Sequence, residues 1–262
     1  MPVSTEYLAQ LFSLEGDVAL ITGGGGAIGA STARAFARAG ATVVLADKVA
    51  DAAARVAAGV GAQGGRALAL EMDVTREDSV RAAVDRATRE LGKIDILVNN
   101  AGINIRKEPH ELTPDDWRTV MDVNLTGYFL CARAVGVGML ARQSGRIINV
   151  ASIMGFRGSS ITPNLAYNTS KGAVVNFTRT LAGEWAPHGI RVNGIAPTYL
   201  MTPLTQKLLS DPVVHGKIAA RTPMGKVGVP EDLDGAMLYL ASPASGMVTG
   251  HVLAVDGGWL AW

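Results

Sequence analysis

Seven short apolar segments alternate with segments of helical pattern along almost the whole chain. A strand that is apolar at every position is buried on both faces, which is typical of a parallel sheet covered by helices on both sides. Because the sequence contains no linker, repeat or low-complexity segment, we expect one α/β domain spanning residues 1–262. The predicted strands are 18–21, 42–46, 67–70, 94–98, 147–150, 190–195 and 252–255.

The balance of charge limits the kinds of partner. The 24 basic and 23 acidic residues leave a formal net charge of +1, with no long run of either sign. Nucleic acids and anionic membranes require a concentrated basic surface, so we expect neither as a partner. The single cysteine, Cys131, excludes an intramolecular disulfide and indicates a reducing compartment. Without an apolar run of about 18 residues or a signal-peptide pattern, we expect a cytoplasmic protein, and no metal site is predicted.

A glycine-rich loop at 22–29 follows the first predicted strand and opens an alanine-rich helix. In this context glycines let the backbone approach a pyrophosphate at the helix N-terminus. Asp47 closes the next strand, where a carboxylate can hydrogen-bond both ribose hydroxyls of an adenosine and repel a 2′-phosphate. Lys48 is the one feature that would soften this repulsion. We therefore expect NAD as the cofactor, with NADP disfavoured.

Tyr167 and Lys171 lie four residues apart in a predicted helix, so the phenol and the ammonium share one face. An isolated phenol, with a pKa of about 10, is a poor base at neutral pH. A nearby cation favours the phenolate and lowers that pKa towards the range in which proton transfer is efficient. The pair predicts proton transfer to or from an alcohol, although the same spacing also describes a lysine stem packed on a ring.

The chain resembles the short-chain dehydrogenase/reductase family, because several sequence motifs of that family occur in it in the same order. The resemblance covers nearly the whole chain. It implies a single Rossmann-like domain, with a doubly wound seven-stranded parallel sheet and helices on both faces, that assembles as a homotetramer. The shared motifs are Thr-Gly-x-x-x-Ala-Ile-Gly at 22–29, Asn-Asn-Ala-Gly at 99–102, Asn124, Ser152, Tyr167 and Lys171.

The resemblance also implies a role for each residue of the site. Tyr167 is the proton donor or acceptor, and Lys171 lowers its pKa while binding the nicotinamide ribose. Ser152 orients the substrate oxygen, and Asn124 holds a water that links Lys171 to solvent. The expected cofactor-binding residues are Gly23, Ala27, Ile28, Gly29, Asp47, Asp73 and Val74 (adenine), Asn100 (ribose), Ala101, Gly102, Tyr167, Lys171, Pro197 and Thr202 (nicotinamide amide).

The substrate is predicted from a finer resemblance. Segments 11–16 and 101–107 look like those of gluconate 5-dehydrogenase and related sugar-acid dehydrogenases. Arg106 would then hold a substrate carboxylate through two hydrogen bonds, or is an ordinary solvated loop arginine. Two departures from the family pattern concern this region: Thr198 stands where glycine is usual, and residues 159–160 look like an insertion near the substrate mouth.

We therefore expect hydride transfer between NAD(H) and a secondary alcohol or ketone, namely a polyol or sugar acid bound by Ser152, Tyr167 and Arg106. A 3-oxoacyl-thioester reductase of the same family is the alternative. Such reductases usually prefer NADPH, which Asp47 disfavours. A nucleotide-binding module without catalysis is the third reading, and it would not need the complete catalytic set.

Two further segments carry expectations about shape and assembly. The stretch 198–229 breaks the alternation and has apolar residues spaced for one short helix, which predicts a substrate lid rather than a solvated excursion. Trp259 and Trp262 are expected to be largely buried, at least partly against a neighbouring subunit. The helices from Pro114 and through Tyr167 are expected to pair between subunits. An apolar stripe on the second of them could form that interface or pack inside the subunit. The stripe comprises Val174, Phe177, Leu181 and Trp185.

Overall fold

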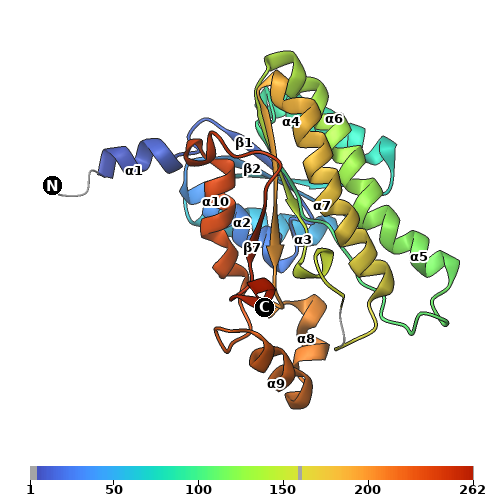
Figure 1. The fold of residues 1–262 in the computed structure, drawn as a ribbon. Helices are drawn as coiled ribbons and strands as arrows, with labels where there is room; N and C mark the ends of the chain where they lie inside the picture. Colours follow the sequence, from blue (N-terminus) through green and yellow to red (C-terminus); the bar gives the residue numbers. More distant parts are fainter. Residues whose placement is uncertain (1–4, 159–160, 262) are drawn as a thin grey trace.

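The computed structural model describes residues 5–158 and 161–261; the candidate insertion at 159–160 lies outside them. Seven strands form one sheet in the order β3-β2-β1-β4-β5-β6-β7, and all pairings are parallel, which confirms the predicted sheet (Figure 1). The strands are β1 (Val18–Thr22), β2 (Thr42–Asp47), β3 (Arg66–Glu71), β4 (Ile96–Asn99), β5 (Gly145–Val150), β6 (Ile190–Pro197) and β7 (Val252–Val255).

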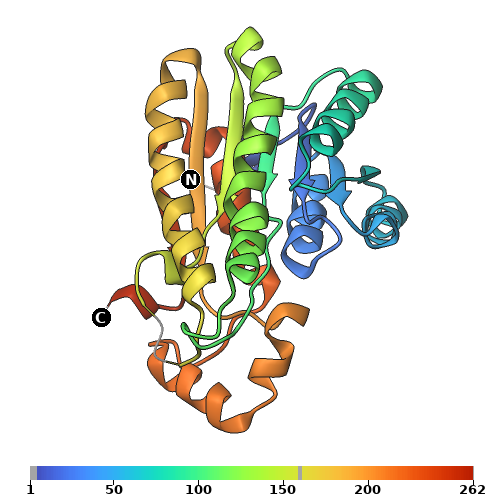
Figure 2. The ribbon, with the colours of Figure 1, turned by 90° about the vertical axis from the view of Figure 1, so that its right-hand side faces the viewer.

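Helices cover both faces of the sheet. They are α2 (Ala27–Arg38), α3 (Ala50–Ala62), α4 (Glu77–Leu91), α6 (Gly127–Arg142), α7 (Leu165–Trp185) and α10 (Asp234–Ala241). Leu20 of β1 lies in an apolar cluster with residues of α4, α6 and α7, whereas its neighbour Ile21 lies in a second cluster with residues of α2, α3 and α10. The sheet is thus the middle of three layers, as predicted (Figures 1 and 2).

The strand order reverses at the centre of the sheet, because β1 pairs with β2 on one side and with β4 on the other. The loops that follow β1 and β4 therefore diverge at the carboxyl edge, which is where open parallel sheets bind ligands. The glycine-rich loop follows β1, and the Asn-Asn-Ala-Gly segment begins at the end of β4. The topology thus brings two predicted motifs to one edge.

The predicted long helix consists of α5 (Pro114–Met121), a π-helical turn (Asp122–Thr126) and α6. It begins with a reciprocal cap: Thr113 Oγ1 accepts from the Asp116 N–H at 3.1 Å, and the Asp116 carboxylate accepts from the Thr113 N–H at 3.0 Å. The π-helical turn, a feature frequent at functional sites, carries Asn124. By length and composition alone this 29-residue helix could cross a membrane, but half of its most apolar 18-residue window is buried in the fold, as in the core helix of a globular protein.

The packing of α7 on α6, which lie side by side on the sheet (Figure 2), uses a glycine. The Trp185 ring lies against Gly136, where an added Cβ would overlap it. Val174 is fully buried, and Phe177 and Leu181 pack against buried core residues. The apolar stripe considered for a subunit interface is therefore largely used inside the subunit.

Gly136→Ala should lower the free energy of unfolding, measured by urea denaturation, by about 1–3 kcal/mol, because the added methyl overpacks the Trp185 ring. Gly183→Ala on α7 is the matched control, since among the described residues nothing outside its own stretch of helix lies within 4 Å of the added Cβ. It should be neutral or stabilising by up to about 1 kcal/mol. A Gly136→Ala variant as stable as the wild type would show that the two helices separate without cost.

The segment 198–229, predicted to contain one short helix, contains two. They are α8 (Pro203–Leu209) and α9 (Pro212–Arg221), at the lower end of the molecule in Figure 2. The Asp211 carboxylate starts the second helix by accepting hydrogen bonds from two backbone N–H groups of α9, at 2.8 and 3.3 Å. The one-helix prediction was wrong because apolar spacing alone ignores this Asp–Pro helix start.

The two ends of the chain differ from each other. Trp259 is 3% exposed, which confirms its predicted burial. Its ring centre lies 5.6 Å from that of Tyr199 and 5.2 Å from the guanidinium carbon of Arg221. Because these residues of the same chain cover it, Trp259 needs no neighbouring subunit for its burial; Trp262 lies outside the described residues. The unpredicted helix α1 (Thr5–Phe12), described throughout, contains no buried residue.

Candidate active site

The turn from β1 into α2 requires two glycines, Gly23 in the loop and Gly29 in the first turn of the helix. Gly23 has a φ of +61°, and a Cβ there would lie 3.0 Å from the Ala101 Cα. A Cβ on Gly29 would lie 2.5 Å from the Gly23 carbonyl oxygen. This tight turn directs the N-terminus of α2 towards a cleft of about 380 Å³ at the carboxyl edge of the sheet. Backbone N–H groups at a helix N-terminus suit a pyrophosphate.

Charged residues fix the far end of the cleft. The Asp47 carboxylate accepts hydrogen bonds from two backbone N–H groups, one of them that of Gly25 at 3.0 Å. The Lys48 ammonium pairs with Asp73 at 2.9 Å. Burial opposes the ionisation of Asp73, but hydrogen bonds from Lys48 and Thr75 outweigh it and lower the pKa of Asp73 to about 2. Lys48 is therefore already paired with an ionised carboxylate.

Asn100 joins the end of β4 to the glycine loop. Its Nδ2 donates to the carbonyl oxygens of Thr22 at 2.9 Å and Gly23 at 3.1 Å. In return, Thr22 Oγ1 accepts from the backbone N–H groups of Asn100 at 2.9 Å and Ala101 at 3.0 Å. The Asn100 side chain, expected to contact ribose, thus has a second task in holding the wall of the cleft.

The cleft gathers most of the predicted cofactor-binding residues. Gly29 lies beneath the loop, and the other three predicted residues that do not line the cleft line an adjoining cavity of about 100 Å³. Sequence reasoning missed Met72, Val123 and Leu204, because an apolar side chain in a loop or helix gives no signal of a cleft. The predicted residues that line the cleft are Gly23, Ala27, Ile28, Asp47, Asp73, Val74, Asn100, Ala101, Gly102 and Thr202.

The adjoining cavity brings together a hydroxyl, a phenol and an amine. Ser152 lies two residues after β5, and Tyr167 and Lys171 project from the first half of α7, so that all three line this cavity. Lys171 Nζ lies 5.7 Å from the centre of the Tyr167 ring. It donates to the Val150 carbonyl oxygen at 2.6 Å and to the Tyr128 hydroxyl at 3.3 Å. The spacing predicted from the sequence therefore places both side chains at one site.

Burial dominates the acid–base properties of these groups. It raises the pKa of Tyr167 above its ordinary value, although the neighbouring Ser152 hydroxyl and the charge of Arg106 act in the opposite direction. Burial also lowers the pKa of Lys171 to about 7. The expected lowering of the Tyr167 pKa below its ordinary value is therefore not seen in this structure. Its physical reason is that a buried lysine near its own pKa carries only part of a charge, while burial penalises the phenolate directly.

Asn124 is held by several hydrogen bonds. Its Oδ1 accepts from the Ile103 N–H at 2.9 Å, and its Nδ2 donates to the Ile103 carbonyl at 3.0 Å and to Ser170 Oγ at 3.0 Å. A Cβ on Gly102 would lie 3.5 Å from Asn124 Oδ1 and 3.7 Å from Lys171 Nζ. Asn124 and Lys171 therefore both lie close to the backbone of Gly102, which has no side chain in the wall of the cleft.

A third cavity, of about 60 Å³, is also lined by Tyr167 and Ser152. Arg106 lines it as well, so the structure brings all three predicted substrate residues together. Other polar residues of this cavity were not assigned from the sequence, because their signals are those of ordinary loops and caps. They are Asn104, Asn164, Thr198, Tyr199 and Thr205.

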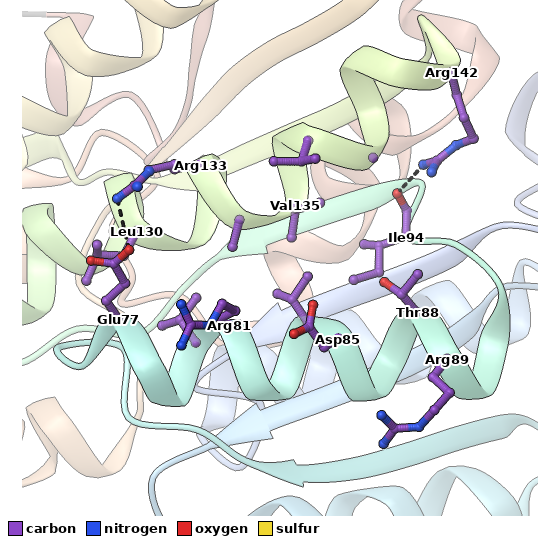
Figure 3. Close-up of a pocket in the computed structure, with 15 residues that line it drawn as sticks. Glu77, Arg81, Asp85, Thr88, Arg89, Ile94, Leu130, Arg133, Val135 and Arg142 are labelled. Carbon is purple, nitrogen blue, oxygen red and sulfur yellow. Dashed lines mark hydrogen bonds and ion pairs between the residues drawn. The ribbon is translucent and has the colours of Figure 1, made fainter.

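A larger cavity of about 640 Å³ lies apart from this site, between α4 and α6 (Figure 3). Its lining includes apolar residues such as Ile94 and Val135, and an ion pair of 3.1 Å between Arg133 and Glu77 spans it (Figure 3). It shares no lining residue with the cleft or with the two small cavities. Within residues 5–158 and 161–261, no group of three or more His, Cys, Asp and Glu residues could hold a metal ion.

Almost the whole chain is similar to several known proteins. A family model described as enoyl-(acyl carrier protein) reductase matches residues 25–260. The chain is 46% identical to cis-4-hydroxycyclohexanecarboxylate dehydrogenase of Sinomonas cyclohexanicum, over 93% of this chain and 96% of that one. It is 40% identical to gluconate 5-dehydrogenase of Gluconobacter oxydans, over 95% and 96%. A solved gluconate 5-dehydrogenase from Burkholderia cenocepacia, in complex with NADP and tartrate, superposes with a TM-score of 0.93 at 40% identity, covering 97% of this chain and 99% of that one. The chain therefore belongs to the short-chain dehydrogenase/reductase family of oxidoreductases.

Proposed function

We propose that this oxidoreductase transfers a hydride between a nicotinamide cofactor and a secondary alcohol or ketone, with Tyr167 as the acid–base group. One observation carries the proposal. Ser152 and Tyr167 line both small cavities, and the cavity that also contains Lys171 shares Gly102 and other residues with the nucleotide-sized cleft. A carbinol bound at Ser152 and Tyr167 would therefore lie between a substrate pocket and the cofactor.

In the direction of oxidation, Ser152 and Tyr167 hold the substrate oxygen by hydrogen bonds. Tyr167 acts as the phenolate, which the protonated form of Lys171 stabilises, and it takes the hydroxyl proton as the carbinol carbon loses its hydride and becomes a carbonyl. A nicotinamide bound in the cleft supplies the hydride acceptor. The cleft fits such a group, because Gly102 leaves its wall open between Asn124 and Lys171. In reduction the Tyr167 proton returns to the oxygen.

We further propose a hydroxy acid as the substrate. The two relatives are named for the 4-hydroxyl of a cyclohexanecarboxylate and the 5-position of gluconate, so each carboxylate carbon is four bonds from the carbinol carbon. The charge of Arg106 lies near enough to act on the Tyr167 pKa, and both residues line one cavity. A guanidinium can bind a carboxylate through two hydrogen bonds while the carbinol reaches Tyr167. The second candidate is reduction of the ketone of a 3-oxoacyl thioester, because the matching family model is described as a reductase of acyl chains on a carrier protein.

A comparison of substrates tests this proposal. Reduced-nicotinamide absorbance should give higher kcat/KM for D-gluconate or cis-4-hydroxycyclohexanecarboxylate than for galactitol, which lacks a carboxylate, and than for reduction of a 3-oxoacyl thioester. We expect a margin of at least about tenfold, or 1.4 kcal/mol. Arg106→Ala should remove most of that margin by raising KM for the acids. Faster reduction of the thioester would overturn the hydroxy-acid proposal.

We propose NAD as the preferred cofactor. The Asp47 carboxylate is fixed beside the glycine loop, at the position where ribose hydroxyls can donate to it and a 2′-phosphate would meet like charge. Lys48 is paired with Asp73 and would have to leave that partner to bind a phosphate. The related Burkholderia structure holds NADP, so membership of the family does not decide the choice.

Cofactor choice should follow Asp47. The wild type should show a kcat/KM for NAD at least about tenfold above that for NADP, and Asp47→Ser should narrow or reverse this ratio. Lys48→Ala is the matched control on the neighbouring residue and should weaken NADP more than NAD. A wild-type preference for NADP would show that the Lys48 cation outweighs the Asp47 carboxylate.

The organisation of the molecule completes the proposal. We propose one domain in which 198–229 acts as a lid, since Leu204 and Thr205 of α8 line both small cavities. A homotetramer is supported by the exposure of Phe129 and Val137 on α6, 48% and 72%. The cytoplasm is the proposed location, and the substrate is a small molecule.

A further inference from the structure

A buried amide oxygen beside the reacting groups has no partner. Asn104 lines the same cavity as Ser152 and Tyr167, and its Oδ1 is buried without a hydrogen-bond partner among the described residues. Thr198 Oγ1, in the same cavity, is in the same situation. Buried polar atoms are nearly always paired, so unpaired ones within a substrate cavity mark positions for polar groups of a ligand.

Hydrogen bonds fix the orientation of this amide. Asn104 Nδ2 donates to Asn164 Oδ1 at 2.9 Å, and Asn164 Nδ2 donates to Thr162 Oγ1 at 2.6 Å. The preceding residue, Ile103, is held through its backbone N–H and carbonyl by Asn124. With its Nδ2 already used, Asn104 retains its Oδ1 as an acceptor in a position set before any ligand arrives.

The Asn164 side chain orients Asn104 and does not cap its own helix. Asn164 is the N-cap residue of α7, a position where asparagine normally accepts a hydrogen bond from a backbone N–H of the first turn. Its side chain makes no such bond, although the residue is only 7% exposed. Local rules of this kind are typically broken at functional sites, and this cap lies three residues before Tyr167.

We propose that Asn104 determines substrate specificity, its Oδ1 accepting a hydrogen bond from a hydroxyl on a carbon next to the reacting carbinol. Asn104 and Tyr167 line the same small cavity of about 60 Å³, so a hydroxyl next to the carbinol held at Tyr167 lies within reach of Asn104. This inference rests on the proposed function and narrows it. A sugar acid carries the required neighbouring hydroxyl, whereas a hydroxycyclohexanecarboxylate does not.

The test compares kcat/KM for D-gluconate with kcat/KM for cis-4-hydroxycyclohexanecarboxylate. Asn104→Leu keeps the size of the side chain but removes the acceptor, and it should lower the gluconate-to-cyclohexane ratio by at least about tenfold. Asn164→Leu keeps the Asn104 acceptor but removes the side chain that orients it, and it should lower the same ratio by a smaller factor. Asn168→Leu is the matched control: Asn168, on α7, also has a buried Oδ1 that finds no partner in the described part of the chain, but the residue lines none of the three site cavities. It should leave the ratio unchanged.

The outcomes separate this inference from the function on which it rests. An unchanged ratio in both Asn104→Leu and Asn164→Leu, or wild-type turnover of the cyclohexane acid alone, would overturn the role of Asn104 and leave the hydroxy-acid proposal standing. Wild-type turnover of neither acid would overturn both. A ratio that falls equally in Asn168→Leu would show a general loss of packing in place of a lost hydrogen bond.

Discussion

Tyr167→Phe is expected to lower kcat by about 100- to 10,000-fold, which is the range that general acid–base catalysis typically contributes. Phenylalanine keeps the ring and its packing but lacks the oxygen that carries the proton beside Ser152. Cofactor affinity should change little, because the glycine loop, Asp47 and Lys171 remain in place. Steady-state rates and a fluorescence titration with the cofactor measure the two quantities.

Tyr239→Phe is the control for this substitution. Tyr239 is a partly buried residue of α10 that packs with the apolar cluster on the opposite side of the sheet from α7, so loss of its hydroxyl should leave kcat at the wild-type value. Near-wild-type turnover by Tyr167→Phe would remove the acid–base assignment. If turnover were absent in the wild type itself, a nucleotide-binding module without catalysis would become the better description.

Lys171→Met is expected to reduce kcat by a similar factor and also to weaken cofactor binding. The substitution removes the cation that stabilises the phenolate while retaining most of the apolar stem. Reduced-nicotinamide absorbance and the same fluorescence titration measure both effects. Full cofactor affinity in this variant would contradict a role of Lys171 in binding the cofactor. Full turnover would contradict its role in stabilising the phenolate.

The buried lysine should also leave a signature in stability. Burial lowers its pKa from 10.5 to about 7, so between these values the unfolded state binds a proton that the folded state lacks. The contribution of Lys171 to the free energy of unfolding therefore rises as the pH increases above about 7, by at most about 1.4 kcal/mol per pH unit. Urea denaturation of wild type and Lys171→Met at pH 7, 8 and 9 should show their difference growing in favour of the wild type. A constant difference would mean that Lys171 is not desolvated.

The fold was predictable because its signals are local. An apolar run such as 18–21 indicates a strand buried on both faces, and the glycine loop that follows it indicates where the chain turns. Asp47 could be placed at the cleft because the first two strands are parallel neighbours. The end of the second strand therefore lies beside the loop that follows the first. Apolar spacing alone does not predict the second helix of the 198–229 segment, because the signal for its start is the Asp211 cap followed by proline.

Other features depend on contacts between distant segments, for which one sequence gives no signal. The pKa of Lys171 follows from burial beneath several elements, and the same burial reverses the expected direction for Tyr167. From the sequence, Asn164 is an ordinary helix-cap residue. Its side chain instead accepts a hydrogen bond from Asn104, sixty residues earlier in the chain. Likewise, the need for glycine at position 136 comes from the Trp185 ring on another helix.

Transfer of a labelled hydride is the most direct measurement of the central claim. The wild type is incubated with oxidised NAD and cis-4-hydroxycyclohexanecarboxylate, or D-gluconate, carrying deuterium on the carbinol carbon, and the reduced cofactor is examined by mass spectrometry. We predict that the wild type moves the deuterium to the nicotinamide and that Tyr167→Phe does so at least about 100-fold more slowly. Reduced cofactor without the label, or equal labelling by the two proteins, would contradict Tyr167-dependent hydride transfer from a hydroxy acid.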